Sequence, residues 1–198
     1  MIPATVNWPQ LALLTLRDPK SAAAEIMSWQ IPRAVLWMAA ALVAIVSTFM
    51  STLSNIVIPV PEPLANMVSS PFTLFMIIAG GFIITVHALF WTGRAIGGAE
   101  DMSDLLALLV WMQTLRAAAQ VAIVIAVLMV PPLASLLVLF VAVATLWVFL
   151  NFISVGLHLN SLMRAFFVLI AGALAMSVGL SIVLSMIGVG SLGVPSNV

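Results

Sequence analysis

Long apolar runs separated by short polar stretches make up most of the chain, and five of them are long enough to form membrane-crossing helices. A helix needs roughly 20 apolar residues to cross a hydrocarbon core of about 30 Å. These runs are too long and unbroken for the alternation of a β-strand. The sequence therefore predicts an all-α integral membrane protein, a five-transmembrane-helix bundle over 34–188. The helices are expected at about 34–58, 71–91, 104–130, 133–154 and 165–188.

Prolines and caps mark the expected ends of these helices. The three prolines of Pro59-Val60-Pro61-Glu62-Pro63 prevent the first helix from continuing. Ser70 and Pro71 are an N-cap and first-turn pair for the second helix. Pro131-Pro132 is expected to close the third helix, with the fourth following at once. Glycines after the fifth helix release the chain into a short tail at 189–198.

Residues 1–33 are mixed in composition and predict a short N-terminal helical segment. Asp18-Pro19 is an N-cap and N1 pair for a helix up to about Ile31, and Trp8-Pro9 opens an apolar turn through Leu16. Tryptophans and cations in this segment favour a position at the cytoplasmic lipid interface. Packing against the base of the bundle is the alternative. The long apolar run that follows is not the pattern of a cleaved signal peptide.

The distribution of cations predicts the orientation. Cytoplasmic loops of membrane proteins carry an excess of Lys and Arg. In this chain the cations fall in alternate connections, which predicts an odd number of crossings, a cytoplasmic N-terminus and an external C-terminus. The expected location is a bacterial inner membrane. The cations concerned are Arg17, Lys20, Arg33, Arg94 and Arg164.

Composition narrows the classes of function. The chain is 64% hydrophobic and 6% charged, whereas soluble domains carry about 25% charged residues. A net charge of zero provides no basic surface for nucleic acid. The absence of cysteine removes disulfides, thiolate nucleophiles and cysteine-ligated metals. No hydrolase motif or membrane-embedded aspartate is present either. We therefore expect a non-enzymatic protein without metal or cofactor.

Arg116 is a charged residue deep inside a predicted transmembrane helix. It lies 12 residues after Asp104, or about 18 Å along the helix. An arginine near the middle of a membrane costs roughly 2.5–3.5 kcal/mol. Gln113 and Gln120 precede and follow it by three and four residues, so the three side chains share one helix face. That face is expected to point into the bundle.

Two arrangements of Arg116 are open, because no carboxylate lies within the apolar runs. In the first, residues 103–112 lie along the interface, and an acidic residue of the 100–104 cluster reaches a shallow Arg116. In the second, a deep Arg116 binds helix-end carbonyls, Asn151 or the phosphate of a lipid. A structural role, satisfied by the protein's own groups, competes with a binding role. The candidate lipid- or anion-binding residues are Gln113, Arg116 and Gln120.

The acidic cluster of Glu100, Asp101 and Asp104 is expected to serve the start of the third helix. Asp101 or Ser103 would cap it, and Asp104 in the first turn would interact favourably with the helix dipole. The cluster lacks the spacing of a calcium loop. The nearby glycines are expected to permit a tight turn, because no phosphate-binding glycine pattern is present. These glycines are Gly93, Gly97 and Gly98.

The remaining polar and small residues predict helix packing. His87 and His158 are expected at interfacial or packing positions, because a proton relay would also need a buried carboxylate. Small residues and hydroxyls let membrane helices approach and bond to one another. The first helix carries such a polar stripe at Thr48, Ser51, Thr52 and Asn55. The helix-packing candidates of the fifth helix are Gly172, Ala175 and Gly179.

Two short motifs and the layout of helices resemble the Yip1 domain family, in particular its bacterial members. The motifs are Leu14-Thr15-Leu16-Arg17-Asp18-Pro19-Lys20 and Gly97-Gly98-Ala99-Glu100-Asp101-Met102-Ser103-Asp104-Leu105-Leu106. The resemblance covers roughly residues 10–188 and implies five helices. Eukaryotic relatives act in vesicle trafficking and carry an Asp-Leu-Tyr-Gly-Pro-like motif. This chain has no tyrosine, so that motif and its link to small GTPases are not carried over.

Two functional interpretations follow. The first is a non-enzymatic membrane protein of Yip1-like build that interacts with membrane lipids or other membrane proteins, a second copy of the chain included. The second is a small transporter or lipid-handling permease with a polar path at Gln113, Arg116 and Gln120. An odd number of helices and the lack of a visible repeat count against the transporter. A dry interior around Arg116 would favour the first interpretation, and a water-filled cavity open to one side would favour the second.

Overall fold

The computed structural model describes residues 6–57, 70–98, 101–159 and 161–186, and the structural statements below concern these residues. They form helices and connecting turns without a strand, so the all-α prediction is confirmed. The Pro59–Pro63 run and the predicted tail at 189–198 lie outside the described residues. The helices are α1 (Trp8–Arg17), α2 (Pro19–Ser28), α3 (Arg33–Val57), α5 (Pro71–Ala95), α6 (Ser103–Met129), α7 (Pro131–Gly156) and α8 (Leu162–Met186).

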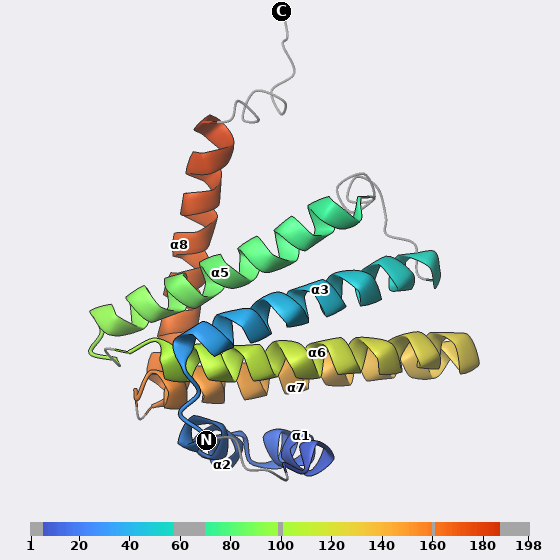
Figure 1. Ribbon diagram of the computed structural model, residues 1–198, viewed down its shortest axis with the longest axis horizontal. Helices are drawn as coiled ribbons and strands as arrows, with labels where there is room; N and C mark the ends of the chain where they lie inside the picture. Colours follow the sequence, from blue (N-terminus) through green and yellow to red (C-terminus); the bar gives the residue numbers. More distant parts are fainter. Residues whose placement is uncertain (1–5, 58–69, 99–100, 160, 187–198) are drawn as a thin grey trace, which may run out of the picture.

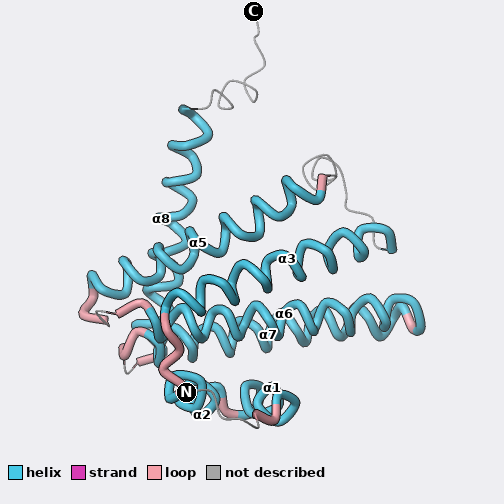
Figure 2. Tube along the Cα trace, viewed as in Figure 1, coloured by secondary structure: helices cyan, strands magenta, loops and turns pink. Residues whose placement is uncertain are grey.

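The long helices pack side by side, with α6 between α3 and α7 (Figure 1). Helix α7 runs antiparallel beside α6, α3 packs on another side, and α5 packs on α3. Helix α8 contacts α5 and α7 and then leaves the bundle at a steep angle to α6 and α7. The connections from α5 to α6 and from α7 to α8 gather at the end of the bundle where α3 begins (Figure 2). This end therefore collects the cations at the ends of three helices, Arg33, Arg94 and Arg164.

Four helices within the described residues are long and apolar enough to cross a membrane: α3, α5, α6 and α7. The shorter apolar helix that accompanies them is Leu162–Val178, the first part of α8. The structure therefore shows a helical bundle of membrane-spanning type. The fifth crossing stays a prediction.

Local sequence signals placed several helix ends correctly. Asp18 caps α2 by accepting the Ser21 backbone N–H at 3.2 Å, and Ser70 accepts the Thr73 N–H at 3.5 Å. Pro131-Pro132 closes α6 as predicted, and α7 follows at once with only Val130 between them; the prolines themselves begin α7, two residues before the expected start at 133. Proline lacks an N–H, and the first helical positions need none, so both prolines fit there.

The short helices α1 and α2 pack on the bundle, against α6 and α7. Of the two positions considered for the N-terminal segment, the structure therefore shows packing against the bundle. Leu11, Ala22 and Ile26 are buried in the common core, and every residue of 105–111 in α6 is buried too. Residues 105–111 of α6 are thus enclosed by protein on all sides.

Candidate anion- and lipid-binding site

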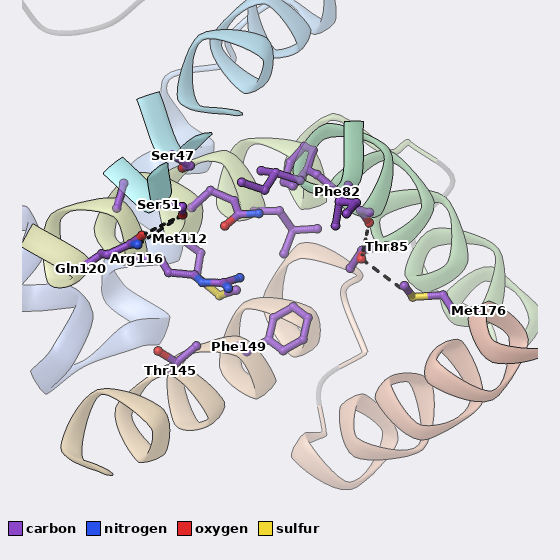
Figure 3. A pocket seen from close by; sticks show the side chains of 16 residues that line it. Ser47, Ser51, Phe82, Thr85, Met112, Arg116, Gln120, Thr145, Phe149 and Met176 are labelled. Carbon is purple, nitrogen blue, oxygen red and sulfur yellow. Dashed lines mark hydrogen bonds between the residues drawn. The ribbon is translucent and has the colours of Figure 1, made fainter. Parts of the chain in front are cut away.

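A cavity of about 500 Å³ lies between the five long helices, close to the middle of their lengths. Helices α3 and α6 form one side, α5 and α7 face each other across it, and α8 contributes Met176 (Figure 3). Its walls combine aromatic rings, Phe82 and Phe149, with the hydroxyls of Ser47, Thr85 and Thr145. Ligand pockets typically have this volume and this mixture of apolar walls with few polar groups.

Arg116 extends into the middle of this cavity (Figure 3). It is the central residue of α6, thirteen residues from Ser103 and thirteen from Met129. Its side chain is exposed, although the helix around it is partly buried. Within the described part of the chain, no hydrogen bond or ion pair engages its guanidinium. An always-charged group with five donors therefore faces an open space.

The two glutamines of the same face differ in their surroundings. Gln120 is engaged with α3, because its amide nitrogen donates to Ser51 at 3.2 Å and to Ser54 at 3.1 Å. Gln113 lines the cavity and takes part in none of the hydrogen bonds found among the described residues. The shared face was predicted correctly, and it points into the bundle. Gln120 joins α3 to α6, while Gln113 and Arg116 remain open toward a ligand.

The acidic residues predicted as possible partners of Arg116 have partners elsewhere. Asp101 accepts the Ser103 backbone N–H and hydroxyl, both at 3.0 Å, and these bonds hold the pKa of its carboxyl below its ordinary value. Asp104 lies 3.2 Å from the His158 ring, outside the cavity. Asn151 donates to the Trp147 carbonyl at 2.8 Å. Glu100, the remaining acidic residue predicted as a possible partner of Arg116, lies outside the described residues.

The predicted glycine turn at this end of the bundle is confirmed. The predicted cap of α6 was wrong, because Met102 holds the N-cap position and makes no side-chain cap hydrogen bond. Asp101 serves the first turn of α6, which also contains Asp104. Gly97 has a φ of +86°, a conformation that a residue with a Cβ adopts at a cost. The Gly98 N–H donates to the Gly93 carbonyl at 2.9 Å and closes a tight turn. A Cβ on Gly93 would lie 2.5 Å from a methyl group of Leu157, so these glycines serve close packing.

The packing candidates of α8 and the histidines are placed as follows. Gly172 is buried at the crossing with α5, where a Cβ would meet Leu89 at 3.2 Å. Ala175 is exposed. Gly179 belongs to α8, but its surroundings lie outside the described part of the structure. His87 stacks on Trp37 of α3 with ring centroids 6.0 Å apart, which is a packing position.

Several polar residues in the cavity wall or beside it were not singled out from the sequence. Ser54, which is 8% exposed, is a hydrogen-bond partner of Gln120 but was omitted from the predicted polar stripe. Thr85 of α5 reaches the Met176 sulfur at 3.8 Å, and Thr145 comes from α7. A single hydroxyl in an apolar helix gives no periodic signal that distinguishes the cavity wall from the lipid face. Among the described residues, no cluster of three metal-ligating side chains forms.

The fold and the cavity define a helical protein of membrane-spanning type with a central cavity that contains one cationic side chain, Arg116. The family model of the Yip1 domain matches residues 13–183, so the chain belongs to the Yip1 domain family. No curated protein and no solved structure matches the chain. The predicted membership is therefore confirmed over most of the expected range of 10–188.

Proposed function

We propose that this Yip1-family membrane protein is non-enzymatic and binds an anionic lipid in its central cavity, with Arg116 as the principal contact. The observation that carries the proposal is an unpaired guanidinium in a cavity of about 500 Å³ whose described lining includes no carboxylate. A buried or lipid-surrounded charge is costly unless it is paired. A phosphate group offers the planar guanidinium two acceptor oxygens in the geometry that it prefers.

The length of α6 supports access of a lipid headgroup to Arg116. About 20 residues cover the hydrocarbon core, so a core that begins near Met129 would end near residue 109. Arg116 would then lie about 10 Å from the inner edge, rather than at the centre of the bilayer. The first turns of α6, enclosed by α1 and α2, would protrude on the inner side. Arginine stems cross apolar surface while the charged head reaches polar groups, which suits this depth.

The same proposal includes the membrane topology. We place the end of the bundle that carries Arg33, Arg94 and Arg164 in the cytoplasm, in keeping with the excess of cations there. With α8 as a fifth crossing, the C-terminus is external, and the membrane is a bacterial inner membrane. Labelling single cysteines at residues 20 and 96 with a membrane-impermeant reagent tests the cytoplasmic placement of this end. Both positions must be protected in intact cells.

Native mass spectrometry of the protein, purified in mild detergent and offered phosphatidylglycerol or phosphatidylcholine, tests the lipid proposal. Charge-assisted hydrogen bonds contribute about 1.5–3 kcal/mol, so Arg116→Gln should weaken phosphatidylglycerol binding about 10- to 100-fold. Arg116→Lys should retain part of the affinity. Arg94→Gln is the matched control, because Arg94 lies over the Trp91 ring outside the cavity. Unchanged phosphatidylglycerol binding by a folded Arg116→Gln variant would overturn the proposal.

Inorganic phosphate separates a lipid headgroup from a free anion as the natural ligand. If the site takes a lipid, phosphate should compete weakly, because it lacks the hydrocarbon part of the ligand. Equal binding of phosphate and phosphatidylglycerol would assign the site to a soluble anion.

A transporter of anionic lipid is the second candidate, and the cavity favours it, because a space of about 500 Å³ between the helices can enclose a headgroup. Liposomes with a fluorescent phosphatidylglycerol distinguish the two. Accelerated exchange between leaflets, lost in Arg116→Gln, would assign transport. Binding without exchange would leave the lipid-binding function.

A further inference from the structure

A second space adjoins Arg116 on the side of the N-terminal helices. It is a groove of about 150 Å³ between α1, α6 and α7, and its walls include Ala12 and Leu16 of α1. Apart from Arg116 and Thr145, the lining residues are alanine, leucine, valine, methionine and phenylalanine. The groove is therefore apolar almost throughout, in contrast to the central cavity with its glutamines and hydroxyls.

The two spaces meet at a shared layer of side chains. Met112 and Arg116 of α6 and Thr145 of α7 line both the central cavity and the groove. The guanidinium therefore stands at the junction of a cavity with mixed polar and apolar walls and a groove that is almost wholly apolar. A ligand that used both would carry an anionic group at the junction and a hydrocarbon part in the groove.

The dimensions and openness of the groove match a hydrocarbon chain. An apolar cavity of about 150 Å³ holds a molecule the size of benzene, so the groove accommodates a short section of a chain. Ala119 and Ala144 form its small-residue walls on α6 and α7. At its margins, Leu16 is 45% exposed and Phe140 is 58% exposed, so the groove opens toward the surrounding bilayer.

We infer that this groove holds one hydrocarbon chain of the anionic lipid whose headgroup binds Arg116, an inference that rests on the proposed function. The ligand is accordingly an amphiphile with an anionic head and at least one alkyl chain. Helix α1 becomes part of the binding site, because Ala12 and Leu16 form one wall of the groove that would hold the hydrocarbon chain. This gives the N-terminal helices a role in ligand selection beyond covering α6.

A phosphatidylglycerol with a photoreactive group on one acyl chain, in phosphatidylcholine vesicles that contain the full chain, tests the inference. We expect crosslinks on α1 near Ala12 and Leu16 and on α7 near Ala144, and unlabelled phosphatidylglycerol should compete them away. Ala144→Phe fills the groove and should lower these crosslinks about tenfold, because overpacking excludes the chain. Ala142→Phe is the matched control, since Ala142 is exposed on the same helix and outside the groove.

The outcomes separate this inference from the proposed function. If Ala144→Phe keeps the crosslinks at α1 while Arg116→Gln loses phosphatidylglycerol, the lipid site stands and the groove assignment is wrong. If Arg116→Gln keeps phosphatidylglycerol, the proposed function itself fails. Native mass spectrometry of a short-chain alkyl phosphate controls for misfolding, because Ala144→Phe should still bind this probe through Arg116. If Ala144→Phe binds neither the photoreactive lipid nor the alkyl phosphate and its melting temperature is lowered, the variant is misfolded. The smaller substitution Ala144→Leu then replaces it, and it must lower the crosslinks by a smaller factor.

Discussion

Replacing Thr15 by valine tests how α1 is held on the bundle. The Trp111 indole N–H donates to the Thr15 hydroxyl at 3.0 Å, and that hydroxyl donates to the Leu11 carbonyl at 2.8 Å. Thr15 is fully buried, and Trp111 is 9% exposed. Valine has nearly the same shape but no oxygen, so the indole N–H would remain buried without an acceptor. An unsatisfied buried donor costs about 1–3 kcal/mol.

Hydrogen exchange of the α1 amides measures this effect directly. If α1 opens as a local unit, protection of its amides should fall about 10- to 100-fold, since 1.4 kcal/mol corresponds to a factor of ten. Thr114→Val is the matched control in α6, because the Thr114 hydroxyl donates only to the Val110 carbonyl of its own helix at 3.0 Å. Trp111→Phe removes the donor, so the double variant with Thr15→Val should be less destabilised than the sum of the single variants.

Equal α1 protection in Thr15→Val and Thr114→Val would refute this reasoning. So would strict additivity in the double variant. Either result would mean that the hydrogen bond contributes nothing to the docking of α1, and that apolar contacts such as those of Leu11 hold it alone.

Two further predictions concern the connections between helices. Gly98→Ala should destabilise the fold by about 1–3 kcal/mol, because its Cβ would lie 2.7 Å from the Gly93 carbonyl oxygen. Gly80→Ala is the control, because a Cβ there meets nothing within 4 Å. Denaturant unfolding in detergent measures the free energy of unfolding of both variants. Hydrogen bonds from Ser21 hold the pKa of Asp18 below its ordinary value of 3.8, so the stabilisation of α2 is present above that value and is lost as the pH falls through the lowered pKa. Asp18→Asn keeps a cap but should abolish this pH dependence of amide exchange in α2, and an unchanged pH dependence would contradict the assignment.

Helix ends and the unusual position of Arg116 could be predicted because both are local properties. Ser70 before Pro71 and Asp18 before Pro19 satisfy free backbone N–H groups within three residues, whatever the rest of the fold does. Arg116 stands out because a charge in an apolar run is costly wherever the helix packs. The start of the fourth helix was placed two residues late, because the prolines that close α6 also occupy the first positions of α7, where no N–H is needed.

The surroundings of the site could not be predicted to the same extent. Ser51 and Ser54 both accept from Gln120, yet the sequence singled out only Ser51, because the rotation of α3 against α6 was unknown. The rotation of α8 likewise decides that Gly172 is buried at α5 while Ala175 is exposed. Neither rotation follows from the spacing of small residues within one helix.

The sequence by itself determined that this chain forms long apolar helices for a membrane and that one face of α6 carries an arginine between two glutamines. Only the tertiary structure decided that this face borders an open cavity, that α1 closes a groove beside it, and that α8 leaves the bundle steeply. The physical reason is the solvent. In water, an apolar stripe marks the inner face of a helix. In a bilayer, lipid and protein interior are equally apolar, so the inner face is settled by packing and hydrogen bonds between helices.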